Sequence, residues 1–129
     1  MSVQVSAIML GVADVDRAKA FYVAGLGCEV DQDFPGFVRC RLGDGSSMLA
    51  LYEWDAVARD AGVSPEGCGF RGVSFHHITD SREQVDEVMR AAQGAGGTVV
   101  KPASAEEWGG YSGFFSDPDG YLWKVVTAS

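Results

Sequence analysis

The chain has 129 residues, 47% of them hydrophobic and 22% charged, a composition that predicts one globular domain. Its formal net charge of −8 argues against nucleic acid or anionic membranes as partners, since both are bound by basic surfaces. No apolar segment approaches the roughly 18 residues of a membrane span, and the first residues lack a signal-peptide pattern, so we expect a cytoplasmic protein. The acidic balance mildly favours a cationic or neutral small-molecule ligand.

The first half of the chain predicts a strand, a helix and then three more strands. Asp14 suits a helix N-cap, because its carboxylate can accept the free N–H groups of the first turn. The following helix places Ala18, Phe21 and Tyr22 on one face, and glycines end it. The five elements are expected over residues 3–11, 15–25, 28–30, 37–42 and 47–52, with a turn at 43–45.

The second half predicts the same order of elements. A strand over 72–78 precedes Ser81 and Gln84, whose spacing is that of a capping box, in which each side chain caps the other residue's backbone N–H. The apolar face of the helix that follows consists of Val85, Val88, Met89 and Ala92. A strand over 98–101 and a hairpin complete this half.

The hairpin is the strongest local signal in the chain. Asp117-Pro118-Asp119-Gly120 is typical of a type I turn, and it joins strands expected over 111–115 and 121–126. Alternation along the second strand places Lys124 on one face with Leu122 and Val126. The other face holds Trp123 and Val125, which we expect to pack beneath the helices.

The two halves therefore form an internal repeat of element order, with little identity between them. We predict modules over 1–54 and 70–129, joined by a connector over 55–69 that contains one short helix. The element order, the stretch from Leu10 to Tyr22 and the stretch from Phe115 to Trp123 resemble the vicinal oxygen chelate superfamily. That superfamily holds glyoxalase I, bleomycin-resistance proteins, extradiol dioxygenases and fosfomycin-resistance proteins.

The resemblance implies an α+β fold of two tandem βαβββ modules. Their strands would form a curved, eight-stranded sheet around a cleft, with the helices outside, and the protein would be a homodimer. The resemblance does not fix the function, because this fold supports several chemistries.

Carrying the superfamily's metal-ligand positions over to this sequence gives Ala7, Ala50, Ser74 and Lys124. A catalytic divalent metal needs three or four N, O or S donors. Alanine offers none, serine is a weak ligand, and a protonated lysine repels a cation. The neighbours that share those strand faces do not restore a set; they are Met9, Met48, Tyr52, His76 and Leu122. We therefore predict that the metal is lost and that no cofactor replaces it.

His76 and His77 are adjacent in a strand, so they point to opposite faces and do not chelate one ion together. His76 shares its face with Ser74 and is either a hydrogen-bonded strand residue or a group that contacts ligand or transfers protons. His77 is expected to face the helix layer or a sheet edge.

Lys124 has three interpretations. Its stem lies along the cavity wall with the ammonium group at the rim, or it pairs with an acidic group or an anionic ligand, or it is a Schiff-base nucleophile with a depressed pKa. Nothing adjacent in the sequence supports the third.

An aromatic pocket is expected if several residues face the cleft rather than the core: Met9, Met48, Tyr52, Trp108, Tyr111 and Phe115. Arg39 and Arg41 share a strand face and are expected to be solvated rather than anion-binding, with Cys40 buried on the opposite face. The three cysteines, Cys28, Cys40 and Cys68, are odd in number and widely spaced, which favours reduced thiols.

Three functional hypotheses follow. The first is a metal-free protein that binds or sequesters a small aromatic or cationic ligand, such as a drug, in the manner of bleomycin-resistance dimers. The second is a metal-independent isomerase or lyase that uses His76 and Lys124 as acid–base groups. The third is a metalloenzyme with relocated ligands, for which Glu53, His76 and Asp80 are the candidates.

Overall fold

A computed structural model describes residues 5–61, 63–67, 69–71 and 73–129, and the chain divides into two compact units, 1–67 and 68–129. Cys68 and the expected strand starts at Val3 and Gly72 lie outside the described residues. No helix in the described part of the chain is long and apolar enough to cross a membrane.

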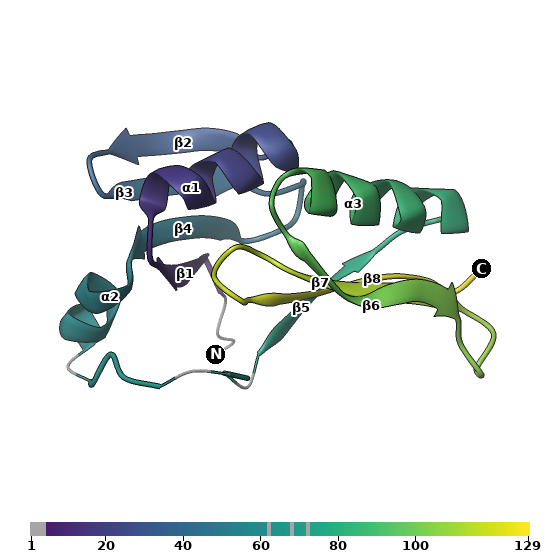
Figure 1. The fold of residues 1–129 in the computed structure, drawn as a ribbon. Coiled ribbons are helices and arrows are strands. Elements are labelled where there is room, and N and C mark those ends of the chain that lie inside the picture. Colours follow the sequence, from purple (N-terminus) through teal and green to yellow (C-terminus); the bar gives the residue numbers. More distant parts are fainter. Residues whose placement is uncertain (1–4, 62, 68, 72) are drawn as a thin grey trace, which may run out of the picture. The chain divides into compact units, whose positions relative to one another are not determined.

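The first unit contains one four-stranded sheet with strand order β1-β4-β3-β2 (Figure 1). Its elements are β1 (Ala7–Val12), α1 (Val15–Lys19), the π-helix η1 (Ala20–Gly25), β2 (Glu29–Phe34), β3 (Phe37–Arg41), β4 (Met48–Glu53) and α2 (Trp54–Ala61). Strands β1 and β4 are parallel, and the other pairs are antiparallel.

The second unit repeats this plan with strand order β5-β8-β7-β6 (Figure 1). Its elements are β5 (Ser74–Ile78), α3 (Arg82–Gly94), β6 (Thr98–Ala105), β7 (Tyr111–Ser116) and β8 (Leu122–Thr127). The predicted α+β fold and the repeated βαβββ order are therefore confirmed, and the eight strands form two four-stranded sheets. The short helix predicted after residue 54 is α2.

The helix predicted over 15–25 changes its geometry part of the way along. Asp14 caps it as expected, with Oδ1 accepting from the Arg17 backbone N–H at 3.1 Å. From Ala20 the chain continues as the π-helix η1. Its wider turn accompanies full burial of two successive aromatic residues, Phe21 and Tyr22, whose rings meet edge to face at 5.0 Å. The prediction from the sequence assumed the regular 3.6-residue period of an α-helix and therefore did not include the π-helical turn.

The capping box of α3 forms with one change. Ser81 Oγ accepts from the Gln84 backbone N–H at 3.2 Å, as predicted. The Gln84 side chain, however, accepts from the backbone N–H of Asp80 at 2.8 Å, one residue before the expected partner. Both bonds satisfy donors at the start of the helix, which no intrahelical carbonyl can reach.

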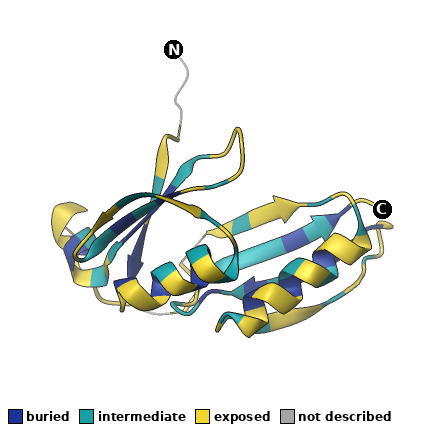
Figure 2. Ribbon diagram, turned by 90° about the horizontal axis from the view of Figure 1, so that it is seen from above, coloured by how far each residue is buried: buried dark blue, intermediate teal, exposed yellow. Residues whose placement is uncertain are grey.

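Each sheet buries the face that packs against its helix. Leu49 and Leu51 of β4 are buried in the first unit, where α1 contacts β3 and β4. In the second unit, Val125 and Phe115 are buried in the same way, and the central strands β7 and β8 are more buried than the outer strands (Figure 2). The predicted packing of Val125 on the helix side is consistent with this pattern.

Gly113 shows how closely the second sheet and α3 approach each other. A Cβ atom at this position would lie 3.0 Å from Met89 Cε on α3 and 3.0 Å from the Ala103 backbone on β6. Glycine is therefore the residue that lets β6, β7 and α3 meet without strain.

The Asp-Pro-Asp-Gly hairpin turn forms as predicted. The Gly120 N–H donates to the Asp117 carbonyl at 3.0 Å, and Asp117 Oδ1 accepts from the backbone N–H groups of Asp119 and Tyr121, each at 2.9 Å. Gly120 has a φ of 91°, which favours glycine. The side chain of Asp117 thus holds both ends of the turn in place.

Tyr111 lies on the side of β7 that faces α3. Its hydroxyl donates to Asp86 Oδ1 at 2.7 Å, and the Arg82 guanidinium lies 5.0 Å from its ring centroid. Donation to the Asp86 carboxylate raises the pKa of Tyr111 above its ordinary value of 10, an effect that Arg82 opposes. Tyr111 therefore contributes to the helix–sheet interface.

We predict that removing this acceptor lowers the pKa of Tyr111. The neutral phenol is the bonded form, so its stabilising effect is fully present below pH 10 and is lost as the pH rises through the raised folded-state value. Ultraviolet titration of the wild type minus that of Tyr111→Phe isolates the Tyr111 transition. In Asp86→Ala, which removes the acceptor, this transition should move toward 10. An unchanged transition would show that the hydrogen bond does not form.

Candidate functional site

The side of each sheet opposite its helix carries most of the residues singled out by the sequence. We call the side opposite α1 the first open face; its residues include Ala7, Met9, Phe37, Arg39, Arg41, Met48, Ala50 and Tyr52. We call the side opposite α3 the second open face; its residues include Ser74, His76, Lys101, Ser112, Phe114, Ser116, Leu122, Lys124 and Val126.

The first open face brings together three of the predicted ligand-binding residues. Met9 is the register partner of Ala50 on β4, and 44% of its surface is exposed. Met48 and Tyr52 are half-buried on β4, and the Tyr52 ring meets Phe37 edge to face at 5.7 Å. These side chains form an apolar patch beside Ala50, whose methyl group cannot bind a metal ion.

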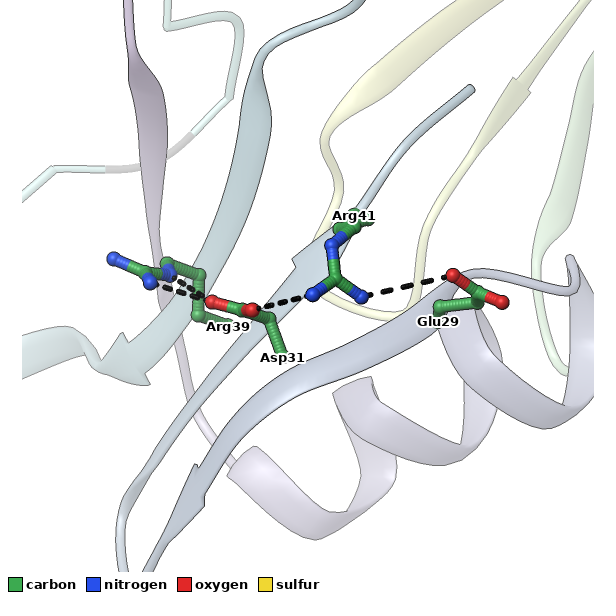
Figure 3. A network of polar contacts seen from close by, with 4 residues as sticks. All are labelled: Glu29, Asp31, Arg39 and Arg41. Carbon is green, nitrogen blue, oxygen red and sulfur yellow. Dashed lines mark hydrogen bonds and ion pairs between the residues drawn. The ribbon is translucent and has the colours of Figure 1, made fainter. Parts of the chain in front are cut away.

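Two arginines on this face share one carboxylate (Figure 3). Asp31 Oδ2 accepts from Arg39 Nε at 2.8 Å and also from Arg39 Nη2, while Asp31 Oδ1 accepts from Arg41 Nη2 at 2.9 Å. Arg41 also lies 3.7 Å from Glu29. Two guanidinium groups thus face two carboxylates, which balances their charge within the protein.

Asp31 was missed from the sequence because the strand predicted over 28–30 ends before it, whereas β2 runs from Glu29 to Phe34. The pairing of β2 with β3 slips between Val30 and Gln32, so Asp31 is left without a register partner. Glu29 is the register partner of Arg41, and Asp31, two residues further on, lies on the same face and reaches both arginines. Cys40, in contrast, is fully buried on the opposite face, as predicted.

The second open face carries a row of side chains that crosses all four strands. His76 on β5 is the register partner of Lys124 on β8, Lys124 of Phe114 on β7, and Phe114 of Lys101 on β6. Ser74 Oγ lies 3.3 Å from His76 Nε2. The predicted sharing of one face by Ser74, His76 and Lys124 agrees with this register. His77 pairs instead with Val125 on the α3 side of the edge strand β5.

Glu106 belongs to the second open face and was not predicted. Its Oε1 accepts from Ser112 Oγ at 2.6 Å, and Ser112 is only 1% exposed. This hydrogen bond lowers the pKa of Glu106, and the positive charges of Lys101 and Lys124 lower it further. The carboxylate therefore remains ionised near the two ammonium groups.

The loop that follows β6 positions Glu106. Its backbone N–H donates to the Gly110 carbonyl at 2.7 Å, which folds the chain back toward β7. The Trp108 ring packs directly against Gly110. A Cβ atom at position 110 would lie only 2.0 Å from Trp108 Cη2, so a larger residue would not fit there with the ring in this position. Trp108 is still 59% exposed. The fold of this loop therefore brings Glu106 to the sheet. The alternation of residues along a strand does not predict such a loop.

The structure separates the remaining predicted residues from this row. Tyr111 points to α3, and Phe115 is 1% exposed, with its ring stacked on Trp123 at a centroid distance of 6.1 Å. Both lie on the α3 side because they alternate with Ser112 and Phe114 along β7. Among the aromatic residues expected near a ligand, Tyr52 and the exposed Trp108 therefore lie outside the interface between α3 and the second sheet.

The donor set does not fit a divalent metal. Within the described ranges, no group of three or more His, Cys, Asp or Glu side chains could hold a metal ion. On the second open face, a lysine ammonium occupies the position opposite His76. Cys28 and Cys40 are free thiols, and burial raises the pKa of Cys28 to about 11, so that thiol is largely protonated at neutral pH.

Comparison with solved structures supports the fold. A glyoxalase-related enzyme from Fulvimarina pelagi is 27% identical, with a TM-score of 0.86 over 96% of this chain and 87% of that one. A lactoylglutathione lyase from Agrobacterium tumefaciens is 26% identical, with a TM-score of 0.72 over 98% and 95% of the two chains.

A glyoxalase/bleomycin resistance protein/dioxygenase family enzyme from Burkholderia phytofirmans has the same fold, at 21% identity and a TM-score of 0.83 over 98% of this chain and all of that one. No curated protein sequence matches the chain. The family described as the glyoxalase/bleomycin resistance protein/dioxygenase superfamily matches residues 4–125. The chain therefore belongs to the glyoxalase/bleomycin resistance protein/dioxygenase superfamily.

Proposed function

We propose that the protein binds a small organic molecule without the help of a metal ion. The observation that carries the proposal is the set of side chains at the four positions where the resemblance places metal ligands: Ala7, Ala50, Ser74 and Lys124. Two methyl groups, a hydroxyl and an ammonium group do not provide the donors of a divalent site.

The surroundings of these positions suit a small-molecule ligand. Such sites are mostly apolar, with a few polar groups that fix orientation. Met9, Met48 and Tyr52 on the first open face offer an apolar and adaptable surface, because methionine adjusts to varied shapes. Ser74, His76 and Lys124 on the second open face offer polar groups.

In this proposal the protein is a drug-binding or sequestration protein that holds an aromatic ligand and releases it unchanged. A homodimer and a cytoplasmic location belong to the same proposal. The expectation of a cationic ligand came from the net charge of the whole chain, and the local charge of the second open face does not support it. That face combines His76, Lys101 and Lys124 with one carboxylate, Glu106.

A second candidate function is a metal-independent isomerase or lyase. The observation that favours it is the register of β5 and β8, which places His76 directly opposite Lys124. An imidazole titrates near neutral pH and can act as a general base, while a lysine ammonium can stabilise a developing negative charge. The likeness to a lactoylglutathione lyase is compatible with such a role.

We predict that protein purified without chelator contains no stoichiometric divalent metal. Elemental analysis by inductively coupled plasma mass spectrometry should find well below one equivalent of zinc, iron, manganese or nickel per chain. Adding each metal should leave the melting temperature unchanged, since an ion that binds the native state would raise it. One equivalent of a metal per chain would contradict the proposal and favour the metalloenzyme with relocated ligands.

We also predict that a thermal-shift screen of aromatic metabolites and antibiotics finds a stabilising compound, and that mass spectrometry recovers it unchanged. His76→Ala should weaken its binding, whereas His77→Ala serves as the matched control, because His77 lies on the α3 side of the same strand. Chemical conversion of the compound, abolished in His76→Ala, would favour the isomerase or lyase. Equal binding by both variants would remove His76 from the site.

A further inference from the structure

The charge of the second sheet differs from that of the rest of the chain. The protein has 18 Asp and Glu residues against 10 Lys and Arg, yet strands β5, β6, β7 and β8 contain no Asp or Glu. They do contain Lys101, Lys124, His76 and His77, and all but His77 belong to the row across the open face. The strands of the second sheet thus place lysines and a histidine, but no carboxylate, on this open face.

The row has a regular geometry. Neighbouring strands lie about 4.8 Å apart, so His76, Lys124, Phe114 and Lys101 span roughly 14 Å. Phe114 stands between the two lysines, half-buried, and Lys124 Nζ lies 5.7 Å from its ring centroid. An aromatic surface flanked by two ammonium groups accommodates an apolar body at its centre and a negative charge at its edge.

The charges near this row do not cancel. Neither lysine forms an ion pair with any carboxylate among the described residues. Glu106 is the carboxylate whose pKa both lysines lower, and its Oε1 is already engaged by Ser112 at 2.6 Å. The two ammonium groups and the one carboxylate leave a net charge of +1. One ligand carboxylate would balance that charge.

The charges on the second open face can be compared with those on the first. There, Arg39 and Arg41 face Asp31 and Glu29, so the protein supplies its own counter-charges (Figure 3). The same protein therefore balances the cations of one sheet and leaves an excess on the other. We infer that the second open face binds an organic monocarboxylate, with Lys124 pairing with the carboxylate and Phe114 supporting the apolar body of the ligand.

This inference rests on the proposed small-molecule binding function and specifies the class of ligand. Its test uses paired probes: benzoate, phenylacetate and hexanoate, each compared with its uncharged carboxamide. Two-dimensional ¹⁵N–¹H NMR of the full chain at low ionic strength follows binding and its location. We expect shifts in the amides of β7 and β8, with each acid binding about tenfold more tightly than its amide, since charge-assisted bonds are the stronger ones.

The variants test the charge of Lys124. Lys124→Met should reduce affinity for the acids about tenfold and leave the amides unaffected. Lys124→Arg, which keeps the charge, should retain binding and also controls for folding. Lys19→Met is the matched control, because Lys19 is paired with Asp33 on the first unit and should not alter binding. Raising the salt concentration should weaken acid binding only.

Other results would overturn the inference. If acids and amides bind equally, or if cationic amines bind better than either, the protein binds small molecules but not through this charge. If the acids shift only amides of the first unit, the site is elsewhere. If none of the acids binds while screened neutral compounds do, the ligand class is wrong and the proposed function stands. If no compound of any charge binds, both fail.

Discussion

The packing of one helix against one side of each sheet is the constraint on which the rest of the structure depends. Val85 and Met89 of α3 and Val125 and Phe115 of the sheet are buried at this interface, and Gly113 lets the layers approach closely. Because side chains alternate along a strand, a residue committed to the helix side cannot serve the open face. The helix interface therefore selects which residues are available for function.

This division explains why the fold was largely predictable and the site only partly so. The helix N-caps, the Asp117–Gly120 turn and the order of elements are local features, and all of them formed. Alternation also placed His76 and Lys124 on a common face. Alternation did not show which face α3 covers on β7, so Tyr111 was expected near a ligand and instead bonds to Asp86.

The residues that the sequence did not reveal are those placed by irregular backbone. Asp31 lies at the register shift in β2, just past the strand predicted over 28–30, and Glu106 reaches Ser112 through the fold of a loop. Both are carboxylates, and both set the local charge of an open face. The net charge of the chain therefore did not predict the charge that a ligand would meet, which is balanced on one sheet and positive on the other.

The two sides of β8 serve different purposes, and substitutions at two adjacent residues test this division. Free energy of unfolding and affinity for phenylacetate would be measured for Val125→Ala and Lys124→Met. Val125→Ala should cost about 2 kcal/mol of stability with unchanged affinity, and Lys124→Met should cost less than about 0.5 kcal/mol but lose affinity about tenfold. Equal losses of affinity in the two variants, or no loss in Lys124→Met, would show that the two sides of β8 are not divided in this way.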